Sequence, residues 1–101
     1  MKTKEEILEY LKSRKAELKE KYGITTLGLY GSYARDEATE NSDIDLFYEK
    51  YIQFEIQSGL EFLRISDNLA KDLKVQKVDF VRLEYMNPII KYYARKDFIY
   101  V

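Results

Sequence analysis

The stretch that decides the fold is Gly31-Ser32-Tyr33-Ala34-Arg35, followed a few residues later by Ser42-Asp43-Ile44-Asp45-Leu46-Phe47. A glycine lets the backbone approach a phosphate group closely, and the serine hydroxyl supplies a further donor. Residues 33–38 favour a short helix, whose first amides and positive dipole end would face the same anion. Most Gly-Ser pairs are ordinary turns, so the phosphate interpretation depends on the residues around this one.

Asp43 and Asp45 are spaced for a shared ligand. On a strand, residues i and i+2 point to the same face, roughly 6.5–7 Å apart at the backbone. Their carboxylates could converge on divalent metals about 4 Å apart, the spacing used for in-line phosphoryl transfer. Two such charges would otherwise repel and raise the pKa of one or both acids. Two exposed acids at a strand edge would show the same spacing, and the pair alone leaves that alternative open.

Composition restricts the chemistry. A chain of 101 residues with 46% apolar residues predicts one small domain, residues 1–101. Lys+Arg 17 and Asp+Glu 18 nearly cancel, so we expect no bulk attraction to nucleic acid or to an anionic membrane. The absence of Cys and His excludes thiol nucleophiles, imidazole bases and Cys/His zinc sites. Any metal should therefore be bound by oxygen, which favours magnesium, calcium or manganese. With no long apolar run and no signal peptide, we expect a cytoplasmic protein.

The N-terminal segment predicts a long helix over residues 3–22. Thr3 and Glu6 have the spacing of a capping box, and Gly23 stands where a C-cap glycine belongs. The apolar residues that recur at helical spacing are Ile7, Leu8, Leu11, Leu18 and Tyr22.

The rest of the chain alternates strands with helices. Apolar and β-branched runs predict strands over 24–30, 44–51 and 77–81, and a short one over 98–101. A helix is expected over 53–73, with Ser58 as a candidate N-cap. Asn87-Pro88 predicts a last helix over 88–95. The apolar stripe of the 53–73 helix would consist of Leu60, Leu63, Leu69 and Leu73.

The combined pattern resembles the nucleotidyltransferase superfamily with a polymerase-beta-like fold. The matching residues are Gly31-Ser32-Tyr33-Ala34-Arg35 and Asn41-Ser42-Asp43-Ile44-Asp45-Leu46. The chain looks most like the minimal nucleotidyltransferases, the small antitoxin partners of HEPN-domain toxins. The resemblance implies an α+β fold with a small mixed β-sheet packed with helices.

The resemblance also implies a role for each site residue. Asp79, in a neighbouring strand, stands where the family has its third acid. Asp43, Asp45 and Asp79 would be the catalytic and metal-binding residues, holding two Mg²⁺ ions, with Mn²⁺ as an alternative. Gly31 and Ser32 would hold the phosphates of the nucleotide, and Arg35 would either pair with phosphate or brace the loop.

One position departs from the family. Asp36 follows the Ala-Arg pair, where the family usually has glycine. An aspartate there adds backbone cost if its conformation is left-handed, and it brings a negative charge near the expected triphosphate. Nucleotide affinity therefore depends on where this carboxylate points.

The reaction that the resemblance implies is transfer of AMP from ATP to an acceptor hydroxyl. The short chain leaves no room for an acceptor-binding domain, so we expect a protein partner to present the acceptor. In the family this looks like a tyrosine of a HEPN ribonuclease toxin, in a type VII-like toxin–antitoxin pair, which implies a hetero-oligomer and no direct contact with nucleic acid or membrane.

Two alternatives stay open. The chain could be a non-catalytic antitoxin that masks its toxin, which Asp36 would favour. It could also be the catalytic subunit of a small-molecule nucleotidyltransferase of the aminoglycoside-modifying type. The aromatic residues near the C-terminus are candidates for either core or interface, and they are Tyr92, Tyr93, Phe98 and Tyr100.

Overall fold

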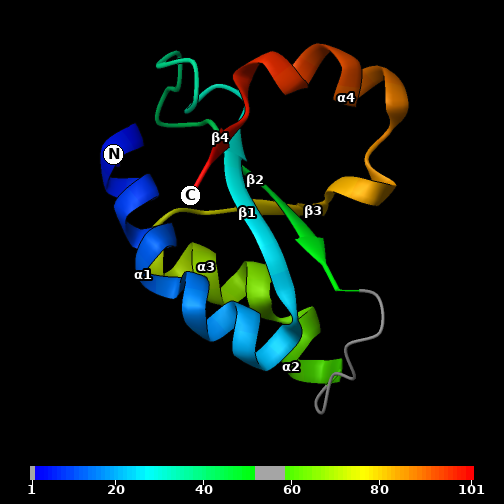
Figure 1. Cartoon of the computed structure of the whole chain (residues 1–101). Coiled ribbons are helices and arrows are strands. Elements are labelled where there is room, and N and C mark those ends of the chain that lie inside the picture. Colours follow the sequence, from blue (N-terminus) through cyan, green and yellow to red (C-terminus); the bar gives the residue numbers. More distant parts are fainter. Residues whose placement is uncertain (1, 52–58) are drawn as a thin grey trace.

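The structure is a computed structural model that describes residues 2–51 and 59–101, and Figure 1 shows the arrangement of its helices and strands. Two short 3₁₀ helices, Leu83–Tyr85 and Arg95–Asp97, precede and follow the last α-helix. The other elements, in chain order, are α1 (Lys4–Tyr22), β1 (Ile24–Tyr30), β2 (Ile44–Lys50), α2 (Gly59–Leu63), α3 (Ile65–Leu73), β3 (Val78–Arg82), α4 (Pro88–Ala94) and β4 (Ile99–Tyr100).

Within these ranges the strands form a four-stranded mixed sheet in the order β3-β2-β1-β4. β1 runs antiparallel to both β2 and β4, whereas β2 and β3 are parallel. A parallel pair needs a crossover connection, and α2 and α3 lie in that connection. This arrangement confirms the expected α+β fold with a small mixed sheet.

Helix α1 begins and ends as its caps predict. The Glu6 amide donates to Thr3 Oγ1 at 3.1 Å, and the Thr3 amide donates to Glu6 Oε1 at 3.0 Å. Gly23 is left-handed, with φ of 70°, and its amide donates to the carbonyls of Leu18 and Lys19. The buried residues of the helix, Ile7, Leu11, Leu18 and Tyr22, belong to the stripe that the sequence predicts.

The main core lies between one face of the sheet and the helices α1 and α3. Successive strand residues alternate between faces, so Leu27, Leu29, Ile44 and Leu46 all point toward these helices. Ile65, Leu69 and Leu73 of α3 complete the same cluster. Burial of these apolar side chains holds β1 and β2 in place. The polar residues of the candidate site lie at the ends of these two strands.

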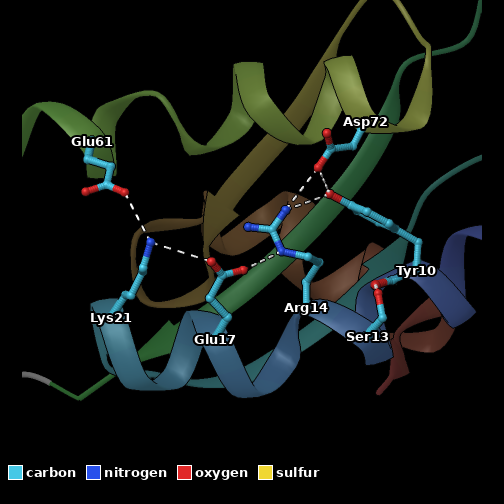
Figure 2. A network of polar contacts seen from close by, with 7 residues as sticks. All are labelled: Tyr10, Ser13, Arg14, Glu17, Lys21, Glu61 and Asp72. Carbon is cyan, nitrogen blue, oxygen red and sulfur yellow. Dashed lines mark hydrogen bonds and ion pairs between the residues drawn. The ribbon is translucent and has the colours of Figure 1, made fainter.

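A polar network ties α1 to α3 and α2 at the edge of this core (Figure 2). Tyr10 donates a 2.5 Å hydrogen bond to Asp72 Oδ2, and Arg14 contacts both of these groups at 3.0 Å. Burial and the hydrogen bond to Asp72 raise the pKa of Tyr10 to about 12. Lys21 bridges Glu17 and Glu61, each at 3.5 Å, and so joins α1 to α2.

A smaller core covers part of the opposite face of the sheet. The Phe47 ring stacks on Phe98 with centroids 4.2 Å apart, and Leu83 and Met86 are buried beside it. Gly28 permits this packing, because a Cβ there would overlap the Phe47 ring and lie 2.6 Å from the Ile99 carbonyl oxygen. Phe98 is therefore a core residue, and the pairing of β4 with β1 depends on a glycine.

The prediction of a short helix over residues 33–38 is wrong. Residues 32–36 form consecutive turns, in which the Arg35 amide donates to the Gly31 carbonyl and the Glu37 amide to the Ser32 carbonyl. Asp36 has a left-handed φ of 59°, which a right-handed helix cannot accommodate. The Gly-Ser turn is thus followed by a loop instead of a helix.

The single helix expected over 53–73 is also wrong. Helices α2 and α3 are separated at Arg64, and residues 53–58, including the expected N-cap Ser58, lie outside the described residues. Leu60 and Leu63 are 61% and 76% exposed, so they do not continue the buried stripe of Leu69 and Leu73. Phe62 fills that place, because its ring packs on Tyr22 and Tyr48 in the core (centroids 5.8 and 6.3 Å apart).

The remaining elements lie where the sequence predicts them, with ends shifted by one or two residues. Asn87 caps α4 by accepting from the Ile89 amide at 2.9 Å, and Pro88 is the first helical residue. None of the helices in the described ranges is long and apolar enough to cross a membrane.

Candidate active site at the end of the central strands

Gly31 joins the end of β1 to the turn and lies directly against Asp45. Its φ of +80° is left-handed, a conformation that side chains disfavour. A Cβ on this residue would overlap Asp45 Oδ2 and lie 3.1 Å from Asp45 Cγ. The glycine therefore lets the backbone of the turn and the carboxylate of Asp45 occupy adjoining space.

Asp45 and Asp79 are register partners in the parallel pair of β2 and β3. Register partners point to the same face of a sheet, on strands about 4.8 Å apart. This face is the one opposite α1 and α3. Burial, the charge of Asp79, a hydrogen bond to Asp79 and the charge of Asp43 together raise the pKa of Asp45 to about 6, against a small opposing effect of Arg35. Asp45 is therefore surrounded by negative charge.

Asp43 completes the group just before β2 begins. Lys77 lies between Asp43 and Asp79, with its Nζ 4.0 Å from Asp43 Oδ2 and 3.3 Å from Asp79 Oδ1. The side chains of both acids are more than a third exposed. Across the two described ranges, the acidic side chains form no ready-made cluster of three metal ligands. The structure thus places the three acids at the same end of β2 and β3, with Lys77 between Asp43 and Asp79.

The three acids nevertheless fit a divalent cation. All are hard oxygen donors, the type that Mg²⁺ and Mn²⁺ prefer. Burial first, and the negative charges of Asp79 and Asp43 after it, raise the pKa of Asp45, and a cation beside this carboxylate would favour its charged form. The space beside Asp45 is kept open by Gly31. A cation bound to all three acids would require the exposed ammonium of Lys77 to move aside and the carboxylates to turn toward one another.

The turn after Gly31 is anchored in the core by Tyr33 and leaves three of its described backbone amides without a backbone acceptor. The Tyr33 ring is buried in the main core, and Ala34 packs against it. In the part of the chain that the structure describes, the amides of Ser32, Tyr33 and Ala34 donate to no backbone carbonyl. These groups can hold a phosphate, as the sequence suggests. The expected contribution of a helix dipole is absent, because no helix follows the turn.

Arg35 braces the loop. Its Nε lies 2.7 Å from Glu37 Oε1, and its Nη1 lies 3.1 Å from Asp97 Oδ2. The Asp97 side chain is only 13% exposed, so this ion pair fixes the turn to the segment that precedes β4. The guanidinium thus occupies the bracing position that the sequence left as one of two alternatives.

Asp36 adopts the left-handed conformation that the family glycine would favour. Its carboxylate lies 2.9 Å from Lys4 Nζ, at the beginning of α1. This ion pair raises the pKa of Lys4, through the hydrogen bond first and the opposite charge second. The negative charge that could disturb a triphosphate is therefore paired with a cation.

A pocket of about 490 Å³ adjoins the turn, and the sequence did not reveal it. Its walls come from the end of β1, the turn and α4, and its apolar residues look like ordinary core positions in the sequence. The structure leaves Ile89, Ile90 and Tyr93 exposed to solvent. The lining residues are Tyr30, Gly31, Arg35, Ile89, Ile90, Tyr93, Ala94, Lys96 and Asp97.

Comparison with known proteins gives a consistent assignment. Residues 5–101 match the model of the nucleotidyltransferase domain family. The protein adenylyltransferase MntA of Thermococcus cleftensis is 35% identical over 100% of this chain and 98% of its own length. Two proteins of Methanocaldococcus jannaschii that are provisionally named protein adenylyltransferases are 39% and 44% identical over the full length of both chains.

A solved structure supports the fold. The crystal structure of a toxin–antitoxin with AMP-PNP aligns with a TM-score of 0.58 at 21% sequence identity. The match covers 77% of this chain and 61% of that chain. At this identity the likeness bears on the arrangement of strands and helices alone.

Proposed function

The chain belongs to the nucleotidyltransferase domain family, and on that premise we propose that it transfers AMP from ATP to a tyrosine hydroxyl of a cognate HEPN ribonuclease toxin. In this proposal it is the antitoxin of a type VII-like pair and acts in the cytoplasm, where ATP is available. The observation that carries the proposal is the pairing of Asp45 with Asp79 against the Gly31 turn. This geometry combines a phosphate-binding backbone with acids on one face of the sheet.

Each residue has a defined task in the proposed reaction. Asp43, Asp45 and Asp79 would hold two Mg²⁺ ions, or Mn²⁺ in their place, which would supply positive charge opposite the phosphates of ATP. The open amides of the turn and the Ser32 hydroxyl orient the β- and γ-phosphates. Asp79 also accepts the proton of the acceptor hydroxyl. Arg35 keeps the turn in place through Glu37 and Asp97.

The proposed acceptor is a protein because relatives of this chain are named protein adenylyltransferases. The name of the MntA relative supports adenylyl transfer to protein, and the structural neighbour is a toxin–antitoxin assembly that holds an ATP analogue. Surface aromatic residues supply candidate contacts for a partner, since Tyr85 and Tyr92 are 74% and 61% exposed. Phe98 is partly buried against Phe47, which makes it a weaker candidate for such a contact.

The test is transfer of label from α-³²P-ATP to the co-expressed partner in the presence of Mg²⁺. We expect labelled partner with the wild-type chain and at least a hundredfold less with Asp79→Asn, which removes a carboxylate with little change of shape. The same reaction with the partner's tyrosines changed to phenylalanine identifies the acceptor.

Two results would replace the proposal. An unlabelled partner in a tight complex, with Asp43→Ala still protective, would assign the chain as a masking antitoxin. Label on an aminoglycoside instead of on the partner would assign it as a small-molecule nucleotidyltransferase.

A further inference from the structure

The pocket beside Gly31 has apolar walls that the protein itself leaves uncovered. Ile89, Ile90 and Tyr93 come from α4 and are 69%, 55% and 65% exposed. None of the residues of α4 is buried, although the helix carries two isoleucines and two tyrosines. Tyr30 closes the pocket from the end of β1. A wall of this composition gains stability when a ligand excludes water from it.

The shape and position of the pocket fit a small organic ligand. Its volume of about 490 Å³ lies within the roughly 300–1,000 Å³ of sites that hold such molecules. Gly31 belongs both to the lining of the pocket and to the contact with Asp45. A ligand in the pocket therefore has one end beside the acidic group.

The charges at the rim suit a ligand that carries phosphate at that end. Arg35 and Lys96 are the cations of the lining. Arg35 is paired with Glu37 and Asp97, which leaves Lys96 as the cation that can meet a phosphate. Tyr30 and Tyr93 present aromatic rings, and any of the nucleobases can stack on such rings because every base has a planar face.

We propose that this pocket binds the nucleoside of ATP. The base and ribose lie against Ile90 and Tyr93, and the phosphates extend past Gly31 toward Asp45. This assignment rests on the proposed function, because it identifies where the nucleotide substrate of that reaction is held. It adds a base-binding wall, formed by α4, to the phosphate-binding turn.

The experiment compares ATP with inorganic triphosphate, which has the phosphates and lacks the nucleoside. Binding of each to the full chain is measured by calorimetry with Mg²⁺ present. We expect Tyr93→Ala to raise the Kd for ATP about tenfold, the range that loss of one stacking ring gives, and to leave the Kd for triphosphate unchanged. Tyr93→Phe keeps the ring and should keep the affinity for ATP.

Tyr85→Ala is the matched control, because Tyr92 packs on the Tyr93 ring with centroids 5.2 Å apart. Tyr85 is 74% exposed and packs on Arg82 outside the pocket. Its removal should change neither Kd by more than twofold. Ser32→Ala, on the phosphate side, should weaken ATP and triphosphate to the same extent.

The outcomes separate this assignment from the proposed function. If Tyr93→Ala binds ATP as the wild type does, or weakens ATP and triphosphate equally, the nucleoside assignment is wrong and the proposed function stands. If Tyr93→Ala keeps ATP affinity but loses the partner protein, the pocket is a docking site for that partner and the assignment is again wrong. If the wild-type chain binds neither ATP nor triphosphate, the proposed function fails and the assignment fails with it.

Discussion

The carboxylate of Asp45 occupies the space that a side chain on Gly31 would need, so the turn and the acid form a matched pair. The two residues come from the facing ends of β1 and β2, where Tyr30 is the register partner of Asp45. Their contact depends on a positive φ at Gly31 and on the missing Cβ. A substitution at residue 31 therefore acts on stability and on the site together.

Gly31→Ala should lower both the free energy of unfolding and AMP transfer. A left-handed alanine costs about 1–2 kcal/mol, and overlap with Asp45 adds to this cost. We expect a total loss of about 2 kcal/mol by urea denaturation and less than a tenth of the wild-type transfer. Gly59→Ala is the control, because its Cβ meets nothing within 4 Å. Equal effects of the two changes would contradict the contact.

Asp45 should make the metal-free protein less stable as the pH rises. Its pKa is raised to about 6 in the folded chain, above the roughly 3.9 of an unfolded aspartate. Below pH 4 the carboxyl is protonated in both the folded and the unfolded chain and does not lower the free energy of unfolding. Between pH 4 and 6 it ionises more readily in the unfolded chain, so the penalty grows and is complete above pH 6.

The measurement is the urea midpoint of the wild type and of Asp45→Asn from pH 4 to 7, with a chelator present. We expect the urea midpoint of Asp45→Asn to rise relative to that of the wild type across this window. The variant should be the more stable protein at pH 7. Addition of Mg²⁺ at pH 7 should stabilise the wild type more than the variant. A difference that does not change with pH would contradict the raised pKa.

Asp36→Gly should restore the family residue with little effect on the reaction. Glycine adopts the left-handed conformation of residue 36 without strain, and the charge that it removes is already paired with Lys4. We expect the KM for ATP to stay within about twofold of the wild type and the urea midpoint to stay equal or rise. A tenfold fall in KM would mean that Asp36 repels the nucleotide despite its ion pair.

Tyr10→Phe should weaken the connection between α1 and α3 without affecting transfer. The change removes the hydroxyl that binds Asp72 and Arg14, and one such bond contributes about 1 kcal/mol. Urea denaturation should show a loss of this size, while the transfer rate per folded molecule stays constant. Tyr92→Phe, at an exposed position, should leave both quantities unchanged.

Much of the fold was predictable because its signals are local. Thr3, Glu6 and Gly23 define α1 through contacts within a few residues, and the apolar pattern of β1 and β2 follows from burial of one face. The acids were predictable because Asp43 and Asp45 share a short motif. Their arrangement with Asp79 came only from the family resemblance, since the register of β2 and β3 is not visible in either strand alone.

The errors have a common physical origin in single residues that interrupt a helical pattern. Asp36 takes a left-handed φ, and Arg64 ends α2 before α3 begins, although neither residue is a glycine or proline. The pocket was missed for the opposite reason. Ile90 and Tyr93 are typical of a buried helix face, and only the structure shows that nothing in the described chain covers them.

The two contacts of Asp45, with Gly31 and with Asp79, join residues at different separations along the chain. Gly31 meets Asp45 through an antiparallel pairing of β1 with the next strand, whereas Asp79 reaches Asp45 only after the crossover through α2 and α3. Contacts that close longer loops cost more loop-closure entropy, and β3 is an edge strand of the kind that can open locally while the rest of the sheet stays paired. Detachment of β3 would thus leave the turn and Asp45 intact and remove the third acid. We therefore expect mild denaturant to abolish transfer before the antiparallel pairing of β1 and β2 is lost.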